Sequence, residues 1–422
     1  MNRIAAAVDR WAEEPFRVFF PLGVLASLAG VLLWPAYFAG WTTVWPAEAH
    51  ARWMVGGFGG CMVVGFLGTA GPRLLGAEPW CRFEILWHAA MALAVMTALA
   101  LNRIAPADLL LGFWLFGVLA SLAFRVLVGR RDVPPPGFPV ALLGVAGAVL
   151  GGIALSMDPV IGLAPETRVL WRLVYFQGLL WLPLLGVAPY LLPRFFGRSS
   201  AHSFAVSTTL PPGWLRHFAV SLAAGLAVLA SFVLESRGLL RSGLLLRAGI
   251  VGTAMLVTVP GLPGLARTNG LGWALRVVPL AGVGGWLLAA GFASSPLLRV
   301  GMLHLMFISA SGLVMLAVAC RVVLGHGGRH DRLESPLRWC HGLWGMVLFT
   351  AATRVFADLV EKIRVSHYIY AAAMWVVVVL FWAWKLRKEA RAPRWAPDAP
   401  HSRCPKPSRR RRLSSLPAEA SR

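Results

Sequence analysis

The chain has 422 residues, of which 58% are hydrophobic and only 14% are charged. Soluble domains carry about 25% charged residues, so this composition excludes a soluble globular protein. The net charge of +22 would suit a nucleic-acid-binding protein, but no binding module is recognisable. The arginines instead cluster at the ends of apolar runs and in the C-terminal tail, where they set topology and meet anionic headgroups. We therefore expect an all-α polytopic membrane protein that does not bind nucleic acid.

Repeated apolar runs of about 20 residues predict membrane-spanning helices. Residues 1–15 lack a cleavable signal pattern and are expected to stay cytoplasmic. Because the connecting loops are short, residues 16–386 are expected to form one twelve-helix transmembrane domain. The predicted spans are Phe16–Gly40, Ala51–Leu75, Glu84–Leu101, Pro106–Val128, Phe138–Met157, Val169–Phe196, Pro212–Leu234, Leu240–Val259, Leu271–Phe292, Leu297–Leu324, Pro336–Leu359 and Val365–Leu386.

The C-terminal segment 387–422 holds eleven Lys and Arg against three acidic residues. This composition, rich also in Pro and Ser, predicts a disordered tail that contacts anionic lipid. Since positive loops and tails stay on the cytoplasmic side, both termini are expected to be cytoplasmic in a bacterial inner membrane. The five cysteines include no Cys-x-x-Cys pair, so no disulfide framework or zinc ribbon is indicated.

Three segments of the chain end alike. Pro72–Gly76 reads PRLLG, Pro193–Gly197 reads PRFFG, and Cys320–Gly325 reads CRVVLG. Their arginines, Arg73, Arg194 and Arg321, lie 121 and 127 residues apart. This spacing predicts three sequential four-helix units, 16–128, 138–259 and 271–386. Chance similarity is the alternative, since Arg followed by Gly is common at cytoplasmic helix ends.

Histidines on the first and third of these marked spans could carry chemistry, because ionisable residues inside membranes are costly. His50 begins span two, and His304 lies about two turns into span ten from the same predicted side. Two imidazoles from different helices at one depth suit axial ligation of haem iron. His326 is 22 residues beyond His304, about 33 Å along a helix, so it predicts a separate site. The alternative for each is an interfacial histidine that bonds a backbone carbonyl or a lipid headgroup.

Soft ligands for copper lie near the same histidines, although methionine is also an ordinary apolar membrane residue. Met54 follows His50 by four residues, and Met302 and Met306 flank His304. His367, at the start of span twelve, is a third ligand candidate on this side, although a structural role is preferred for it. A structural role is also expected for His88, His217 and His341. Tryptophans near predicted span ends, among them Trp181, are expected at the membrane interface.

The chain resembles the NnrS family in three segments. Glu14–Phe20 is similar to that family's Phe-Arg-Pro-Phe-Phe opening, and the segment from His50 to Pro72 is similar to its His-Ala-His-Glu-Met stretch and the Gly-Phe-Leu-Leu-Thr-Ala that follows. Arg321–Arg329 is similar to its Ala-Arg-Val-Ser-Leu-Gly-His-Thr-Gly-Arg ending.

The resemblance implies a haem- and copper-containing, twelve-span protein of the nitric oxide stress response, with nitric oxide as a ligand. It carries metal-ligand roles to His50, His304 and His326. The family's second histidine is Arg52 here, and its following Glu is Trp53.

Three sequential four-helix units also resemble the catalytic subunit of haem-copper oxidases, in which helices two and ten supply haem ligands. A copper centre of that kind needs histidines on helices six and seven, and span six has none. Whether the protein is an enzyme stays open. The alternatives are a metal-free transporter of a small solute, suggested by Gly and Pro breaks within spans, and an assembly scaffold that acts through its basic tail.

Overall fold

The computed structural model describes residues 3–260, 269–329, 333 and 335–392. In these residues the chain is helical with no strand, and twelve helices are long and apolar enough to cross a membrane, which confirms the predicted fold class. Spans eight and nine both form. The twelve spans are Phe16–Phe38, Ala47–Leu74, Arg82–Ala100, Ile104–Gly129, Phe138–Ile161, Pro165–Phe196, Trp214–Ser236, Leu240–Thr258, Gly270–Gly291, Pro296–His326, Arg338–Leu359 and Glu361–Arg391.

Seven of these spans are single α-helices and five change helix type along their length. The single helices are α2 (Phe16–Phe38), α5 (Arg82–Ala100), α7 (Phe138–Ile161), α10 (Trp214–Ser236), α11 (Leu240–Thr258), α12 (Gly270–Gly291) and α16 (Arg338–Leu359). The composite spans are α3 (Ala47–Arg52), η1 (Trp53–Gly59) and α4 (Gly60–Leu74); α6 (Ile104–Phe124) and η2 (Arg125–Gly129); α8 (Pro165–Leu173), η3 (Val174–Gly178), α9 (Leu179–Leu191) and η4 (Leu192–Phe196); α13 (Pro296–His304), η6 (Leu305–Gly312) and α14 (Leu313–His326); and η7 (Glu361–Ile363) and α17 (Arg364–Arg391).

The two chain ends differ from the sequence-based expectation. A short helix, α1 (Arg3–Glu13), precedes the first span, and its Asp9 pairs with Arg82 at the start of α5 (Oδ2 to Nη2, 2.7 Å). The last helix, α17, continues to Arg391, so the predicted boundary of the disordered tail at residue 387 lies five residues too early. Residues 393–422 of that tail lie outside the described part of the chain.

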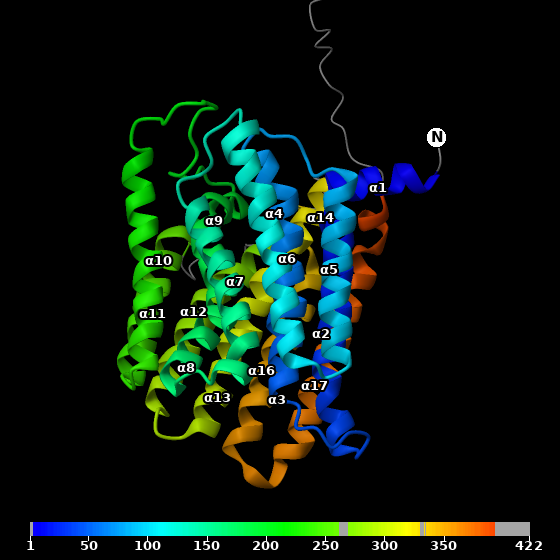
Figure 1. Cartoon of the computed structure of the whole chain (residues 1–422), viewed down its shortest axis with the longest axis vertical. Helices are drawn as coiled ribbons and strands as arrows, with labels where there is room; N and C mark the ends of the chain where they lie inside the picture. Colours follow the sequence, from blue (N-terminus) through cyan, green and yellow to red (C-terminus); the bar gives the residue numbers. More distant parts are fainter. Residues whose placement is uncertain (1–2, 261–268, 330–332, 334, 393–422) are drawn as a thin grey trace, which may run out of the picture.

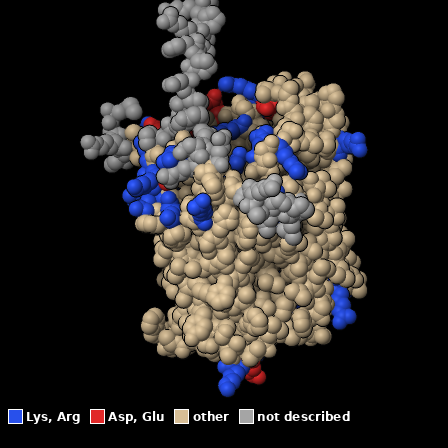
Figure 2. All heavy atoms as spheres, turned by 180° about the vertical axis from the view of Figure 1, so that it is seen from behind, with Lys and Arg blue, Asp and Glu red and all other residues tan. Residues whose placement is uncertain are grey.

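The spans run along one common axis, and α1 and α3 mark opposite ends of the bundle (Figure 1). We call these the α1 end and the α3 end. Spans two, six and ten all run from the α3 end to the α1 end (Figure 1). Lys and Arg gather at the α1 end, while the middle of the visible face is mostly uncharged (Figure 2). This distribution is that of a protein whose apolar belt faces lipid.

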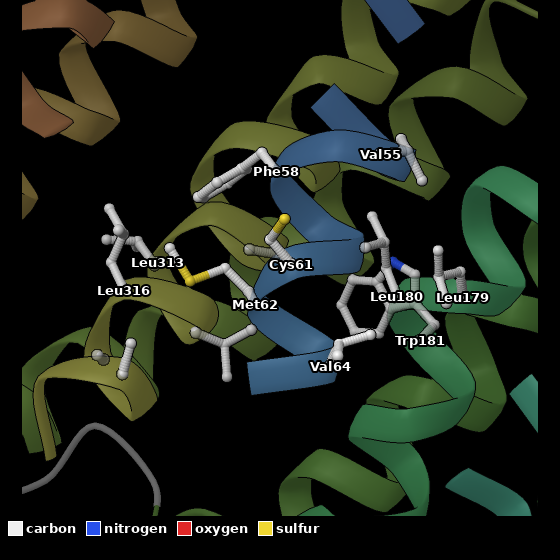
Figure 3. Close-up of a cluster of buried hydrophobic side chains, with 14 of the residues drawn as sticks. Val55, Phe58, Cys61, Met62, Val64, Leu179, Leu180, Trp181, Leu313 and Leu316 are labelled. Atoms are coloured by element: carbon white, nitrogen blue, oxygen red, sulfur yellow. The ribbon is translucent and has the colours of Figure 1, made fainter. Parts of the chain in front are cut away.

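The three spans that carry the repeated motif meet in the core. Cys61 and Met62 of α4 lie between Trp181 of α9 and Leu313 of α14 (Figure 3). Trp181 is 1% exposed, and its indole nitrogen donates to the sulfur of Met306 at 3.0 Å. The prediction of an interfacial Trp181 is therefore wrong: Trp181 lies near the middle of span six (Pro165–Phe196), away from both membrane interfaces.

Spans two, six and ten also share a π-helical interruption, formed by η1, η3 and η6. η1 begins at Trp53 and η3 at Val174, 121 residues later, which is the separation between Arg73 and Arg194. π-Helical turns are rare and occur frequently at functional sites. A fourth π-helical segment, η2, ends span four, so the interruptions are not confined to the motif-bearing spans, and the division into four-helix units stays a prediction.

Candidate metal centre

His50 lies at the α3 end, one turn into span two, where a glycine lets a neighbouring helix approach. A Cβ on Gly30 of α2 would meet Trp53 at 2.8 Å, so only glycine permits this contact between the two spans. As a result the Gly30 carbonyl reaches the Nδ1 of His50 at 2.9 Å. The Trp34 ring packs against the imidazole, with 5.9 Å between ring centroids. The ring of His50 is therefore fixed from two sides.

His304 is the last residue of α13 and is placed by a second glycine contact. A Cβ on Gly301 would meet the Asp358 carboxylate of α16 at 2.7 Å, so Gly301 lets α13 lie close to that helix. The Nδ1 of His304 lies 2.8 Å from the carbonyl of Val300, one turn earlier. His50 and His304 lie within electrostatic range of each other, and Arg354 lies within range of both. The structure thus brings these two predicted residues into one neighbourhood.

The hydrogen bonds of the two histidines fix which ring nitrogen carries the proton. A carbonyl oxygen can only accept, so Nδ1 must be the donor in both residues. The lone pair then lies on Nε2, and within the described ranges no residue hydrogen-bonds to Nε2 of either histidine. Metal-ligating histidines typically donate their other N–H to a backbone carbonyl in this way. The pair therefore fits the chemistry of a haem or copper ligand set.

A charged network closes the α3 end beside the pair. Arg354 of α16 donates to Asp358 at 2.6 Å, and its guanidinium lies over the Tyr368 ring at 4.3 Å. The Tyr368 hydroxyl donates to the other oxygen of Asp358, and its ring packs against Trp34 at 5.2 Å. Asp358 is 3% exposed, and its charge is balanced by Arg354 because solvent cannot reach it. The sequence reading missed Arg354, whose only signal was a cation within span eleven.

Arg52, which stands where the family pattern has its second histidine, belongs to a buried ion pair. Its guanidinium donates to both oxygens of Asp108 on α6, at 2.7 and 2.8 Å, and to Glu48 at 2.6 Å. Arg52 is 5% exposed and Asp108 1%. Glu48 in turn accepts from Arg172 at 2.8 Å, which ties span two to spans four and six. The substitution therefore gives this position a structural bond in place of an imidazole.

His326, the third predicted ligand, lies at the α1 end with its ring nitrogens already engaged. Its Nδ1 is 2.6 Å from Glu14, and Arg73 contacts both Nδ1 and Nε2. Burial alone would raise the pKa of Glu14, but hydrogen bonds from His326 and Arg17 outweigh it and hold the pKa at about 2. Glu14 is fully buried. The metal role of His326 stays a prediction, and its present contacts are those of an ion-pair cluster.

Other methionines and histidines singled out in the sequence have structural partners. Met306 is fully buried, and its sulfur accepts the Trp181 hydrogen bond. His367 bonds the Ile363 carbonyl at 3.1 Å, and His88 packs on Trp80 with 4.4 Å between ring centroids. Within the described ranges no cluster of three or more His, Cys, Asp or Glu could hold a metal ion. A centre here would therefore rest on two histidines, as axial haem ligation does.

A second buried cation lies in span eight and was also missed from the sequence. Arg247 is fully buried; it pairs with Glu235 at 2.8 Å and donates to Gln177 of η3 at 2.8 Å. The Trp286 indole donates to the same Gln177 oxygen at 3.2 Å. Since Gln177 is part of the π-helix of span six, this network fixes the interruption to spans seven, eight and nine.

The fold and the site together define a twelve-span helical membrane protein with a paired-histidine site at one end. The family model described as NnrS protein matches residues 10–394. The chain therefore belongs to the NnrS family, which confirms the resemblance. No curated protein matches the chain. Membership supports a multi-pass membrane protein related to the nitric oxide response.

Proposed function

We propose that the protein binds haem iron between His50 and His304 and acts in the nitric oxide response of a bacterial inner membrane. The observation that carries the proposal is that each histidine bonds a backbone carbonyl through Nδ1. This leaves the Nε2 atom of each ring free to bind a metal. Haem iron, when bound, would supply one-electron chemistry, and nitric oxide would reach an iron held by both histidines only by displacing one of them. Copper, held by the same two nitrogens, is the second metal that these donors suit.

The chain's own residues would hold and tune such a group. Gly30 and Val300 orient the two imidazoles through their carbonyls, and Trp34 limits rotation of His50. Arg354 places a positive charge beside both rings, while Asp358 balances it. The cluster of Lys and Arg at the α1 end supports an orientation with both chain termini in the cytoplasm, which puts the histidine pair at the outer side.

The test is the ultraviolet–visible spectrum of the detergent-purified protein as isolated, after reduction, and after addition of nitric oxide. We expect a Soret band that sharpens on reduction and shifts with nitric oxide, and that is lost in His50→Ala and His304→Ala. His341→Ala is the matched control, because His341 lies on α16 at the α1 end, half-buried against Trp273. A flat spectrum from protein made with ample haem would contradict the proposal.

The alternative is a metal-free transporter of a small solute. Measurements on the same purified protein distinguish it from the haem proposal. A transporter would be colourless, and its solute would raise the unfolding temperature by mass action. A cavity between spans two, six and ten at the α1 end is the observation that favours it. A colourless protein whose stability responds to a solute would replace the haem proposal.

A further inference from the structure

The three arginines of the repeated motif line one cavity at the α1 end. This cavity has a volume of about 350 Å³ and lies between the ends of spans two, six and ten. Arg73 enters it from α4, Arg194 from η4 and Arg321 from α14. The sequence showed only that three spans end alike, and the structure brings those ends together around a common space.

The lining of the cavity carries excess positive charge. Among the described residues that line it there is no Asp or Glu, whereas Thr69, Tyr190 and His326 add polar groups beside the arginines. Glu14 lies 3.7 Å from Arg73, and its carboxylate is also bonded to His326 and Arg17.

Arg194 and Arg321 have no carboxylate partner among the described residues. Arg194 donates to Ser203 at 3.0 Å and lies over the Tyr190 ring at 3.9 Å. Arg321 stacks on Phe195 at 4.6 Å, and among the described residues its side chain makes no hydrogen bond or ion pair. The two guanidinium groups also repel each other. An anion between them would relieve this repulsion.

A second, apolar cavity adjoins the first. It has a volume of about 80 Å³, shares four lining residues with the first and lies deeper between the same three spans. Apart from Ser311, its lining is apolar. The shared residues are Phe66, Val187, Leu191 and Val318. A ligand with an anionic group and an apolar part would match both spaces.

We propose that Arg73, Arg194 and Arg321 form a binding site for a phosphate group. Guanidinium forks match phosphate oxygens and form charge-assisted hydrogen bonds that are about twice as strong as neutral ones. Basic pockets between membrane helices suit the headgroups of anionic lipids. The phosphate is carried either by an anionic phospholipid, whose acyl part would extend toward the apolar cavity, or by a soluble phosphate compound. The site is separate from the histidine pair and does not depend on haem.

The experiment measures the unfolding temperature of the detergent-purified full chain in two arms. One arm adds phosphatidylglycerol, with phosphatidylcholine as the neutral lipid. The other adds inorganic phosphate, with sodium chloride at equal ionic strength. Each arm is run on wild type, Arg321→Gln and Arg194→Gln. Arg216→Gln is the control, because Arg216 is exposed at the same end of the bundle, on α10, outside the cavity lining.

We expect one probe to stabilise wild type and Arg216→Gln equally, because a ligand that binds the native state raises its stability. The concentration needed should rise about tenfold or more in Arg321→Gln and Arg194→Gln, as for loss of a charged hydrogen bond. Stabilisation by phosphatidylglycerol assigns the site to a lipid, and stabilisation by inorganic phosphate assigns it to a soluble compound. Equal responses in all four proteins, or no response to either probe, would overturn the proposal. Should one arginine variant fail to fold, the other carries the test.

Discussion

Both ends of the bundle hold histidines, but the ring nitrogens of these histidines are engaged differently at the two ends. At the α3 end His50 and His304 each bond one carbonyl through Nδ1 and keep Nε2 free. At the α1 end His326 has both ring nitrogens in contact with charged partners. A histidine near a family motif is therefore not a ligand by its position alone. A histidine can bind a metal only when one ring nitrogen is free, and the contacts of the two nitrogens decide this.

Arginine shows the same contrast within the membrane. Arg52 and Arg247 are buried and saturated by carboxylates and amides, so they hold spans together. Among the described residues Arg321 stacks on Phe195 and makes no hydrogen bond or ion pair, and it lines a cavity. A paired cation in low dielectric has a structural role, whereas one whose donors face a cavity is suited to bind an anion.

The largest effect on stability is expected from breaking the buried pair near the histidine site. Asp108→Asn leaves the Arg52 charge without its bidentate partner, and such losses cost about 3–5 kcal/mol. The expected result is a clear fall in the unfolding temperature of the purified protein. Asp132→Asn is the comparison, because Asp132 lies in the loop before α7 and bonds only backbone amides. An unchanged unfolding temperature in Asp108→Asn would contradict the assigned role of Arg52.

A smaller loss of stability is expected at the α1 end. It distinguishes a histidine with a structural role from one that binds a metal. His326→Ala removes the bond to Glu14, which should cost about 1–3 kcal/mol while leaving the haem content unchanged. Haem per protein and the unfolding temperature are measured together on the same preparation. Loss of haem without loss of stability would show instead that His326 is the ligand.

A further effect concerns pH at the α1 end. The pKa of Glu14 is held at about 2, below its ordinary 4.5. A lowered folded-state pKa contributes stability above the unfolded-state value, and this is lost as pH falls through the folded value. The unfolding temperature of wild type should therefore fall between about pH 4.5 and pH 2. In Glu14→Gln this part of the fall should be absent, and an identical pH profile would contradict the ion-pair assignment.

The sequence predicted the spans better than the contacts between them. Long apolar runs identify helices such as α10 directly, because burial in lipid needs little more than length and hydropathy. The shared depth of His50 and His304 also followed from helix counting. The Arg52–Asp108 pair and the cavity shared by Arg194 and Arg321 could not be predicted, because these residues are distant in sequence. Only packing through glycines such as Gly30 decides which groups meet.

The most direct test of the account is electron paramagnetic resonance of the oxidised protein. We predict a low-spin signal of haem with two imidazole ligands in wild type and in His326→Ala, and its loss in both His50→Ala and His304→Ala. A low-spin signal that survives either of those two substitutions would contradict the central claim. So would its disappearance in a folded His326→Ala protein.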